Sequence, residues 1–320
     1  MTPYWDDFPG MPDAMKKVSG IIQLSSASQS SIISQGLNAL FNGDGKLLRP
    51  GLLLLSGGFG KIAEKHYNLA ACLEMLHMAT LIHDDVIDDS PMRRGKPAIH
   101  TLYGKRDAVL MGDYLLSRCF VLAADYTSPE NAMALAKVIA IICSMEIEQN
   151  NDRFRINTSI RRYFRTIMGK TAMLFSLACH VGASEAKAPK PVIQILRRTG
   201  YDIGMAFQII DDILDYSGIE EQVRKPLGND LKDGIVTLPL IITLQKNPLT
   251  LKNLASPDSY SQSDCTMLLE AVHSSGGIES ARAYARRYTE RALNRINTLP
   301  TCNARDSLEK LTRGLLVRDY

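Results

Sequence analysis

The sequence has no apolar run long enough to cross a bilayer and no N-terminal segment of the kind that directs secretion. Its longest apolar stretch, residues 132–145, is interrupted by Lys137 and is shorter than the roughly 20 residues that a spanning helix needs. Residues 1–20 contain Asp6, Asp7 and prolines where a signal peptide would carry an apolar core. We therefore expect a soluble cytoplasmic protein with at most peripheral membrane contact.

The cysteines form no pattern. No two of them stand at C-x-x-C spacing, and no histidine lies near one at the spacing of a zinc site. This excludes the usual sequence signatures of structural zinc and of a disulfide framework. We expect free thiols, mostly buried, in a reducing compartment, at Cys72, Cys119, Cys143, Cys179, Cys265 and Cys302.

The sequence also lacks a strong charge of one sign. Its net charge is only +3 and the basic residues are scattered, which argues against a nucleic-acid-binding surface but leaves phosphate-bearing small molecules open. No linker, charge block or low-complexity tract divides the chain, and there is no heptad or solenoid repeat. We predict a single domain over residues 1–320.

Apolar residues recur at helical spacing through most of the chain, and no segment shows the alternation of a strand. The fold class predicted is therefore all-α. Residues 183–191 are expected to form a loop, and the Gly- and Lys-rich residues 220–235 a longer loop that could act as an active-site lid. We expect helices over residues 18–41, 61–89, 107–124, 129–149, 158–181 and 192–216, with further outer helices beyond.

The helix expected at 61–89 is apolar on nearly every face and ends in a cluster of carboxylates. Helical spacing places Asp84 and Asp88 on one face with Asp85 beside them. Unpaired, these groups repel each other, and oxygen ligands of this kind suit a hard ion such as Mg²⁺. Taken alone, the cluster also fits a solvated helix end.

A second cluster with the same Asp-Asp-x-x-Asp spacing follows another apolar helical run. It comprises Asp211, Asp212 and Asp215. Two such clusters could face each other across a cavity and bind a metal bridged by substrate phosphates, which neither could do alone. The pair therefore indicates a metal diphosphate site.

Cations precede the expected start of one helix. Lys46 and Arg49 come just before Pro50, which suits the first turn of a helix. A helix N-terminus with two such neighbours is a plausible diphosphate site. Ordinary loop cations are the alternative at this point.

Further candidates surround the first acid cluster. Arg93, Arg94 and Lys96 follow it directly, and they could grip phosphate oxygens or remain solvated loop charges. His77 lies seven residues before Asp84, hence on the same side of the helix, where it fits either a structural or a substrate-binding role.

Polar groups also interrupt two apolar helices. Glu146 and Gln149 lie at helical spacing and fit either a functional role or a paired core position. Lys170 and Thr171 place a charge and a hydroxyl inside another apolar helix.

These residues, taken together and in order, resemble the trans-isoprenyl diphosphate synthases. The resemblance covers about residue 43 to the C-terminus and implies an isoprenoid-synthase-type helical bundle around a central cavity, usually as a dimer. It also implies that an allylic diphosphate ionises and that the double bond of isopentenyl diphosphate attacks the carbocation. The motifs are the two acid clusters, Gly45-Lys46-x-x-Arg49-Pro50, Arg93-Arg94-Gly95, Gly169-Lys170-Thr171-Ala172, Phe207-Gln208 and Thr237-Leu238-Pro239.

The resemblance assigns roles to these residues. The diphosphate leaves only if its developing charge is neutralised, so Mg²⁺ is the implied cofactor. Neutral oxygens of Thr171 and Gln208 would face the carbocation, and the proton would go to the departing diphosphate. Isopentenyl diphosphate would bind Lys46, Arg49, His77 and Arg94. Arg93, Lys170 and Lys225 would assist the metal ligands Asp84, Asp85, Asp88, Asp211, Asp212 and Asp215.

One position departs from the family. Members commonly carry lysine after the glycine that precedes Thr-Leu-Pro, but here Ile235 follows Gly234. Lys232 is a candidate to replace the lost phosphate contact. The change also leaves room for a heterodimer in which a small helper subunit is needed, instead of a homodimer. Two further alternatives stay open: a class I terpene cyclase, and a subunit without activity of its own.

Product length is predicted from the helix before the first cluster. Short-chain synthases resemble one another in having bulky aromatics there, whereas this chain has Ala79 and Thr80. A growing chain could then pass along Met75, Cys72 and Asn68, about 18 Å of helix. We predict extension of farnesyl or geranylgeranyl diphosphate to a hexaprenyl to octaprenyl product, as in quinone side chains; a geranylgeranyl diphosphate synthase is the shorter-chain alternative.

Overall fold

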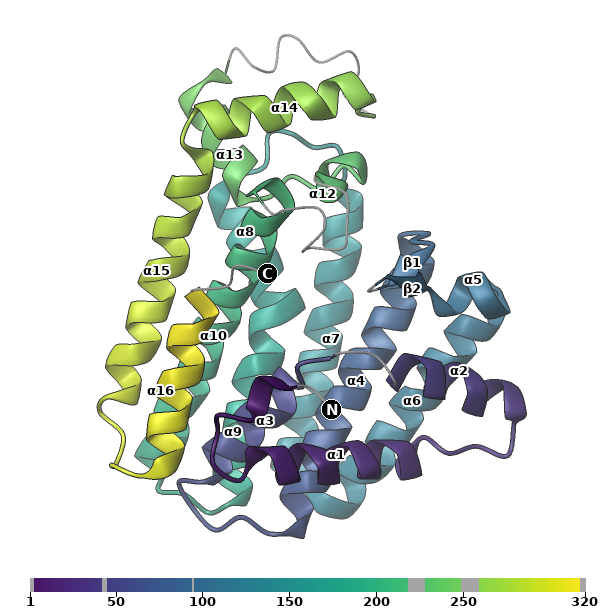
Figure 1. The fold of residues 1–320 in the computed structure, drawn as a ribbon, viewed down its shortest axis with the longest axis vertical. Coiled ribbons are helices and arrows are strands. Elements are labelled where there is room, and N and C mark those ends of the chain that lie inside the picture. Colours follow the sequence, from purple (N-terminus) through teal and green to yellow (C-terminus); the bar gives the residue numbers. More distant parts are fainter. Residues whose placement is uncertain (1–2, 42–44, 94, 218–227, 249–258, 317–320) are drawn as a thin grey trace. The chain divides into compact units, whose positions relative to one another are not determined.

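The protein is almost entirely helical (Figure 1). Within the described ranges, the strands amount to one antiparallel hairpin, β1 (Met92–Arg93) and β2 (Lys96–Pro97). The all-α prediction is confirmed. The computed structural model describes residues 3–41, 45–93, 95–217, 228–248 and 259–316.

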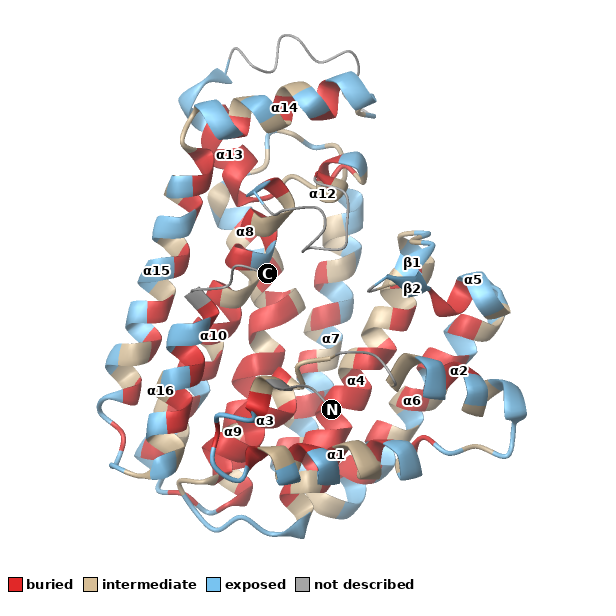
Figure 2. Cartoon of the chain, in the orientation of Figure 1, coloured by how far each residue is buried: buried red, intermediate tan, exposed pale blue. Residues whose placement is uncertain are grey.

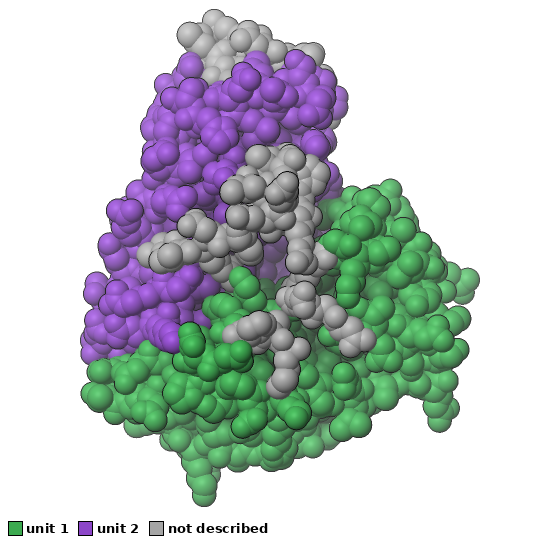
Figure 3. All heavy atoms as spheres, in the orientation of Figure 1, with its two compact units in different colours: residues 1–135, 177–197, 299–308 green, residues 136–176, 198–298, 309–320 purple. Residues whose placement is uncertain are grey.

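The chain divides into two compact units, coloured separately in Figure 3. The first comprises residues 1–135, 177–197 and 299–308, and the second comprises residues 136–176, 198–298 and 309–320. Each is built from segments that are not continuous in sequence, which agrees with the absence of a linker. The prediction of a single domain stays a prediction.

The first unit is organised around α4 (Glu64–Ile87), which packs along α6 and against α1 and α3. Nearly every face of α4 is apolar, so it is buried on most sides, as Figure 2 shows. The helix predicted at 61–89 is confirmed, with ends a few residues inside the expected ones. The other elements of this unit are η1 (Pro3–Trp5), α1 (Met11–Ser25), α2 (Ser31–Phe41), α3 (Leu48–Gly57), α5 (Ile99–Tyr103) and α6 (Lys105–Tyr126).

Four helices contribute residues to both units: α7 (Pro129–Asn151), α9 (Met173–Glu185), α10 (Lys190–Ser217) and α16 (Asn303–Leu316). The elements that belong to the second unit alone are α8 (Ile160–Ile167), the π-helical segment η2 (Met168–Ala172), α12 (Asn229–Lys232), α13 (Leu238–Lys246), α14 (Gln262–Ser274) and α15 (Gly277–Ile296).

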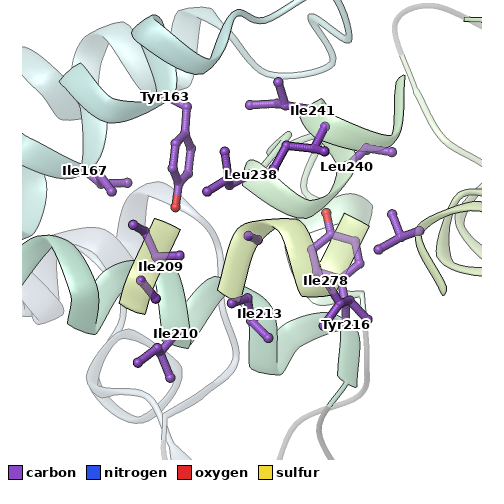
Figure 4. Packing of buried hydrophobic residues seen from close by; sticks show 14 of the residues in the cluster. Tyr163, Ile167, Ile209, Ile210, Ile213, Tyr216, Leu238, Leu240, Ile241 and Ile278 are labelled. Atoms are coloured by element: carbon purple, nitrogen blue, oxygen red, sulfur yellow. The ribbon is translucent and has the colours of Figure 1, made fainter. Parts of the chain in front are cut away.

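The core of the second unit gathers around the C-terminal half of α10. Ile209 and Ile213 from α10 meet Leu238 from α13, and Tyr163 from α8 joins the same cluster (Figure 4). All four side chains are at most 5% exposed. Apolar burial on this scale, roughly 2 kcal/mol per side chain, fixes the helix that carries the second acid cluster.

The single helix predicted at 18–41 is wrong. The structure has two helices, α1 and α2, separated by residues 26–30. This connection is rich in serine, whose hydroxyls compete with the helical backbone for hydrogen bonds; Ser34 Oγ, for example, donates to the carbonyl oxygen of Ser28 over 2.8 Å.

The single helix predicted at 158–181 is also wrong. It is replaced by α8, η2 and α9, because one wide π-helical turn interrupts the regular helix. π-Helical turns are rare and are frequent at functional sites, and this one contains Lys170 and Thr171. The loop expected at 183–191 is shortened to residues 186–189.

Candidate active site

The first acid cluster lies at the C-terminal end of α4. Asp84 and Asp88 are half-buried and one turn apart, with the Asp88 amide donating to the Asp84 carbonyl over 2.8 Å. Asp85 is buried. The cluster therefore offers two carboxylates on one face of the helix and a third that faces inward.

The inward carboxylate of Asp85 is paired with Arg93 from the β1–β2 hairpin. Arg93 Nε lies 2.9 and 3.1 Å from the two carboxylate oxygens, and a guanidinium NH₂ group also bonds to one of them. Asp85 is thus neutralised by a bidentate ion pair. Sequence reasoning placed both groups at the metal diphosphate but did not foresee that they bind each other; Arg94 lies outside the described residues.

The first residues predicted to bind isopentenyl diphosphate lie at the start of α3. Lys46 and Arg49 are half-buried, and the indole Nε1 of Trp5 donates to the carbonyl oxygen of Lys46 over 2.7 Å. Leu47, between them, has a left-handed backbone with φ of 49°, a strained conformation for leucine that the anchored neighbours hold. The lone tryptophan therefore positions this cationic segment.

His77 lies half-buried on α4, one to two turns before the acid cluster. Its carbonyl oxygen accepts a 2.8 Å hydrogen bond from the hydroxyl of Thr80. That bond ties the Thr80 hydroxyl to the helix itself.

The residues predicted to line the growing product follow the buried side of α4. Ala79 and Met75 are fully buried and Cys72 is 2% exposed. Cys72 also lines a small apolar cavity of about 20 Å³ in the first unit, together with residues of α6, α7 and α9. Two small side chains, Ala79 and Cys72, and this cavity therefore lie on the side of the helix that is predicted to face the product.

The second acid cluster is asymmetric. On α10, Asp211 is exposed, Asp212 is buried and Asp215 is half-buried. Because Asp211 and Asp215 are four residues apart, they share one face of the helix. Asp212 is turned away from them into the core.

Asp212 accepts hydrogen bonds on both carboxylate oxygens. Gln208 Nε2 donates to one oxygen over 2.8 Å, and Tyr163 Oη donates to the other over 2.5 Å. Burial raises the pKa of Asp212 against these two hydrogen bonds, which lower it, while the charges of Asp211 and Asp215 raise it further. Sequence reasoning missed Tyr163, whose only signal was its position two turns before Thr171.

Asp215 holds the segment that returns after α10. Its two oxygens accept the backbone amides of Asn229 and Asp230, each over 3.2 Å, at the first turn of α12. A carboxylate in this position neutralises unpaired amides of a helix N-terminus. Lys225, predicted to assist at the diphosphate, lies outside the described residues.

The π-helical segment η2 carries Lys170 and Thr171. Lys170 Nζ lies 3.1 Å from a Glu146 carboxylate oxygen and 2.9 Å from Gln149 Oε1. The two polar residues that interrupt α7 are therefore the partners of this lysine. They fix its ammonium group, which supports the interpretation of Glu146 and Gln149 as paired polar residues of the core.

Thr171 lies against Gln208 across the η2–α10 contact. Its hydroxyl donates to Gln208 Oε1 over 2.6 Å. The approach depends on Gly204, one turn before Gln208, because a β-carbon at that position would lie 2.6 Å from the Ala172 α-carbon. The two residues predicted to face the carbocation thus contact each other directly.

The carboxylates of the two acid clusters supply only part of the ligand set of a hard divalent ion. Within the described ranges, no three His, Cys, Asp or Glu side chains converge closely enough to hold a metal by themselves. Each cluster instead offers two oxygen ligands on one helix face, Asp84 with Asp88 and Asp211 with Asp215. This suits Mg²⁺, which retains waters and takes further ligands from substrate phosphates.

The comparisons with known proteins identify the family of this chain. A profile of the family described as polyprenyl synthetase matches residues 30–272. The chain belongs to the polyprenyl synthetase family. It is a trans-prenyltransferase, which agrees with relatives that are named as prenyl diphosphate synthases.

Relatives of similar length extend the likeness over nearly the whole chain. Heptaprenyl diphosphate synthase component 2 of Geobacillus stearothermophilus is 36% identical over 311 residues, which is 97% of each chain. Heptaprenyl diphosphate synthase from Staphylococcus aureus superposes with a TM-score of 0.93 at 34% identity, covering 97% of this chain and 99% of that one. Geranylgeranyl pyrophosphate synthase from Lactobacillus brevis superposes with a TM-score of 0.92 at 36% identity, covering 98% and 99%.

The position that departs from the family lies beside α12. The backbone amide of Ile235 donates to the Asp230 carbonyl over 2.7 Å, and Gly234 adopts a φ of 75° against the Phe154 ring.

Among the described helices, none has the length and apolar character needed to cross a membrane.

Proposed function

We propose that this chain elongates an allylic diphosphate, farnesyl or geranylgeranyl diphosphate, by repeated addition of isopentenyl diphosphate. The main support for this proposal is the hydrogen-bonded pair of Thr171 and Gln208. Their oxygens are neutral acceptors, Gln208 lies one turn before the exposed Asp211 on α10, and a neutral dipole stabilises a carbocation without capturing it. The proton lost in each addition goes to the departing diphosphate.

Mg²⁺ is the proposed cofactor. Bound to the diphosphate, it would neutralise the charge that develops as the leaving group departs. Asp84, Asp88, Asp211 and Asp215 are the carboxylates that share helix faces and would hold it. The family resemblance also assigns Asp85 and Asp212 to the metal, but they are engaged by Arg93 and by Tyr163, so we propose that they support the site without binding the ion.

Isopentenyl diphosphate would bind the cations at the start of α3 and after α4. Lys46 and Arg49 stand next to the first turn of a helix, whose N-terminal amides favour anions. His77 and Arg94 are proposed as further contacts. Lys170 and Lys225 would assist at the allylic diphosphate, and Arg93 would act through Asp85.

The proposed product is of medium to long chain, hexaprenyl to octaprenyl. The buried side of α4 presents Ala79 and no aromatic side chain before the acid cluster, and the cavity at Cys72 lies two turns further from it. Two of the three relatives named above are heptaprenyl diphosphate synthases. Such a product suits a quinone side chain. A geranylgeranyl product is the second candidate, favoured by the likeness to the Lactobacillus brevis enzyme.

We also propose that the chain works with a second subunit, either its own copy or a small helper. The Geobacillus stearothermophilus relative and one of Bacillus subtilis are named component 2 of heptaprenyl diphosphate synthase, which implies another component in those organisms. The six free cysteines favour a reducing compartment such as the cytoplasm.

Incorporation of labelled isopentenyl diphosphate by the purified chain, with and without a candidate helper, tests this proposal. Incorporation by the chain alone supports a self-sufficient homo-oligomer, and incorporation only after addition of the helper supports the heterodimer. A chain that converts geranylgeranyl diphosphate to a hydrocarbon without consuming isopentenyl diphosphate would be a terpene cyclase and would contradict it.

A further inference from the structure

An unbroken series of hydrogen bonds links Tyr163 to Thr171 within the second unit. Thr171 donates to Gln208 over 2.6 Å, Gln208 donates to Asp212 over 2.8 Å, and Tyr163 donates to the other oxygen of Asp212 over 2.5 Å. Asp212, Tyr163 and Thr171 are each at most 5% exposed. The series runs from the buried core to the residue proposed to face the carbocation.

The direction of each bond follows from the chemistry of the groups. Only the NH₂ group of the Gln208 amide can donate, and it is this group that bonds to Asp212. The amide oxygen of Gln208 must then point toward Thr171. The single hydroxyl proton of Thr171 is used in that contact, so the threonine offers only oxygen lone pairs to any other neighbour.

Tyr163 is the rigid end of this series. Its ring packs in the apolar core beside Ile209 and Leu238, with the hydroxyl directed at α10 (Figure 4). Among the hydrogen bonds of the described residues, this hydroxyl is the one that engages the second oxygen of Asp212. Without it, a buried carboxylate oxygen loses its donor, and the side chain is free to turn away from Gln208.

We propose that Tyr163 is a positioning residue that acts through Asp212 to hold the amide of Gln208 and the hydroxyl of Thr171 with their oxygens available to the carbocation. The inference deepens the proposed function and rests on it. It also gives Asp212 a role different from that of Asp211 and Asp215. Asp212 orients a dipole, whereas the other two share one face of α10 and are the proposed metal ligands.

This role has a distinct kinetic signature. A dipole that is aligned for the carbocation acts in the transition state, so its loss lowers kcat and leaves substrate binding unchanged. Tyr163→Phe removes only the hydroxyl. We expect kcat to fall about tenfold, with the KM of both diphosphates and the Mg²⁺ concentration at half-maximal rate changed less than twofold.

Two comparison variants sharpen the test. Tyr216→Phe removes another fully buried tyrosine hydroxyl of the same core, which accepts a hydrogen bond from Thr237 and, among the hydrogen bonds of the described residues, makes none to Asp212, so kcat should stay within twofold of the parent. Asp211→Asn should shift the Mg²⁺ requirement upward severalfold. An unchanged kcat in Tyr163→Phe, or a Mg²⁺ shift as large as that of Asp211→Asn, would overturn the proposal.

Unfolding measurements test the linkage without activity. Among the hydrogen bonds of the described residues, Tyr163 and Thr171 are linked through Asp212 and Gln208, so the destabilisation by Tyr163→Phe should shrink by at least half when Thr171→Val is already present. Equal destabilisation in both backgrounds would contradict the linkage. A parent chain that incorporates no isopentenyl diphosphate, yet shows this coupling, would refute the proposed function and leave the linkage standing.

Discussion

Arg93 grips both carboxylate oxygens of Asp85, so the cation just after the first acid cluster neutralises a member of that cluster. The Asp85 side chain is 5% exposed and that of Arg93 is 26% exposed. Breaking such a pair from one side leaves a buried charge without its partner.

Arg93→Gln is therefore expected to destabilise the protein by about 2 kcal/mol and to lower activity through the displaced end of α4. In a background that already carries Asp85→Asn, the same substitution should cost less than half as much. Urea unfolding of the two single variants and the double variant measures this coupling. If the two substitutions lower the unfolding free energy additively, the ion pair does not stabilise the protein. Arg93 would then be expected to contact the diphosphate directly.

Mg²⁺ is expected to bind weakly to the chain in the absence of diphosphate, because within the described residues no three potential ligands converge. Titration calorimetry with inorganic diphosphate, corrected for the association of Mg²⁺ with diphosphate itself, should show at least tenfold tighter binding of the ion and the anion together. Asp211→Asn should reduce this gain. Micromolar binding of Mg²⁺ to the free chain would contradict the proposed sharing of ligands with the substrate.

Product length is expected to follow the position of a bulky side chain along α4. Ala79→Phe should give the shortest product, Met75→Phe a longer one and Cys72→Phe the longest of the three. The first and last positions are seven residues apart, about 10 Å of helix, which corresponds to about two isoprene units. Chromatography of the dephosphorylated products measures the series. The same chain length in all three variants would show that the product does not pass along this side of the helix.

The carboxylate of Glu185 is expected to make the first unit less stable at acid pH. Burial by itself would raise the pKa of this carboxyl, but hydrogen bonds from Lys65, Ser128, Thr127 and Asn131 outweigh it and lower the pKa to about 2. A lowered pKa stabilises the folded state above the unfolded value of 4.5, and the contribution disappears as the pH falls toward 2.

The difference in unfolding free energy between the parent and Glu185→Gln should therefore be about 3 kcal/mol near pH 7. It should shrink by about 1 kcal/mol between pH 6 and pH 3.5. Urea unfolding across this range measures it. A difference that is constant or that grows toward acid would mean that Glu185 is not held as a carboxylate.

Helical periodicity predicted the all-α fold and the helices that carry both acid clusters. The polar interruption of an apolar helix singled out Thr171 and the family resemblance added Gln208, and the structure brings these two residues into direct contact. These features depend on local periodicity and on groups whose chemistry is unusual inside an apolar helix, and both can be seen in a sequence.

The partners of these groups could not be predicted from spacing. Arg93 and Asp85, or Tyr163 and Asp212, meet through tertiary packing, and in each pair the residues are also candidates for a direct role. The π-helical turn at 168–172 escaped prediction because the helix that follows it is apolar on most faces, which hides the change of phase that one extra residue in a turn causes. The break at 26–30 was marked by serines, which are compatible with a helix as well as with a turn.

Chain-length analysis of the products made from farnesyl diphosphate, isopentenyl diphosphate and Mg²⁺ tests the central claim most directly. The purified chain, with a helper subunit where it needs one, is predicted to give a ladder that ends at one defined polyprenyl diphosphate of hexaprenyl to octaprenyl size. A reaction that stops after a single addition, at geranylgeranyl diphosphate, would contradict the proposed product. Absence of any elongation, with and without a helper, would contradict the proposed function itself.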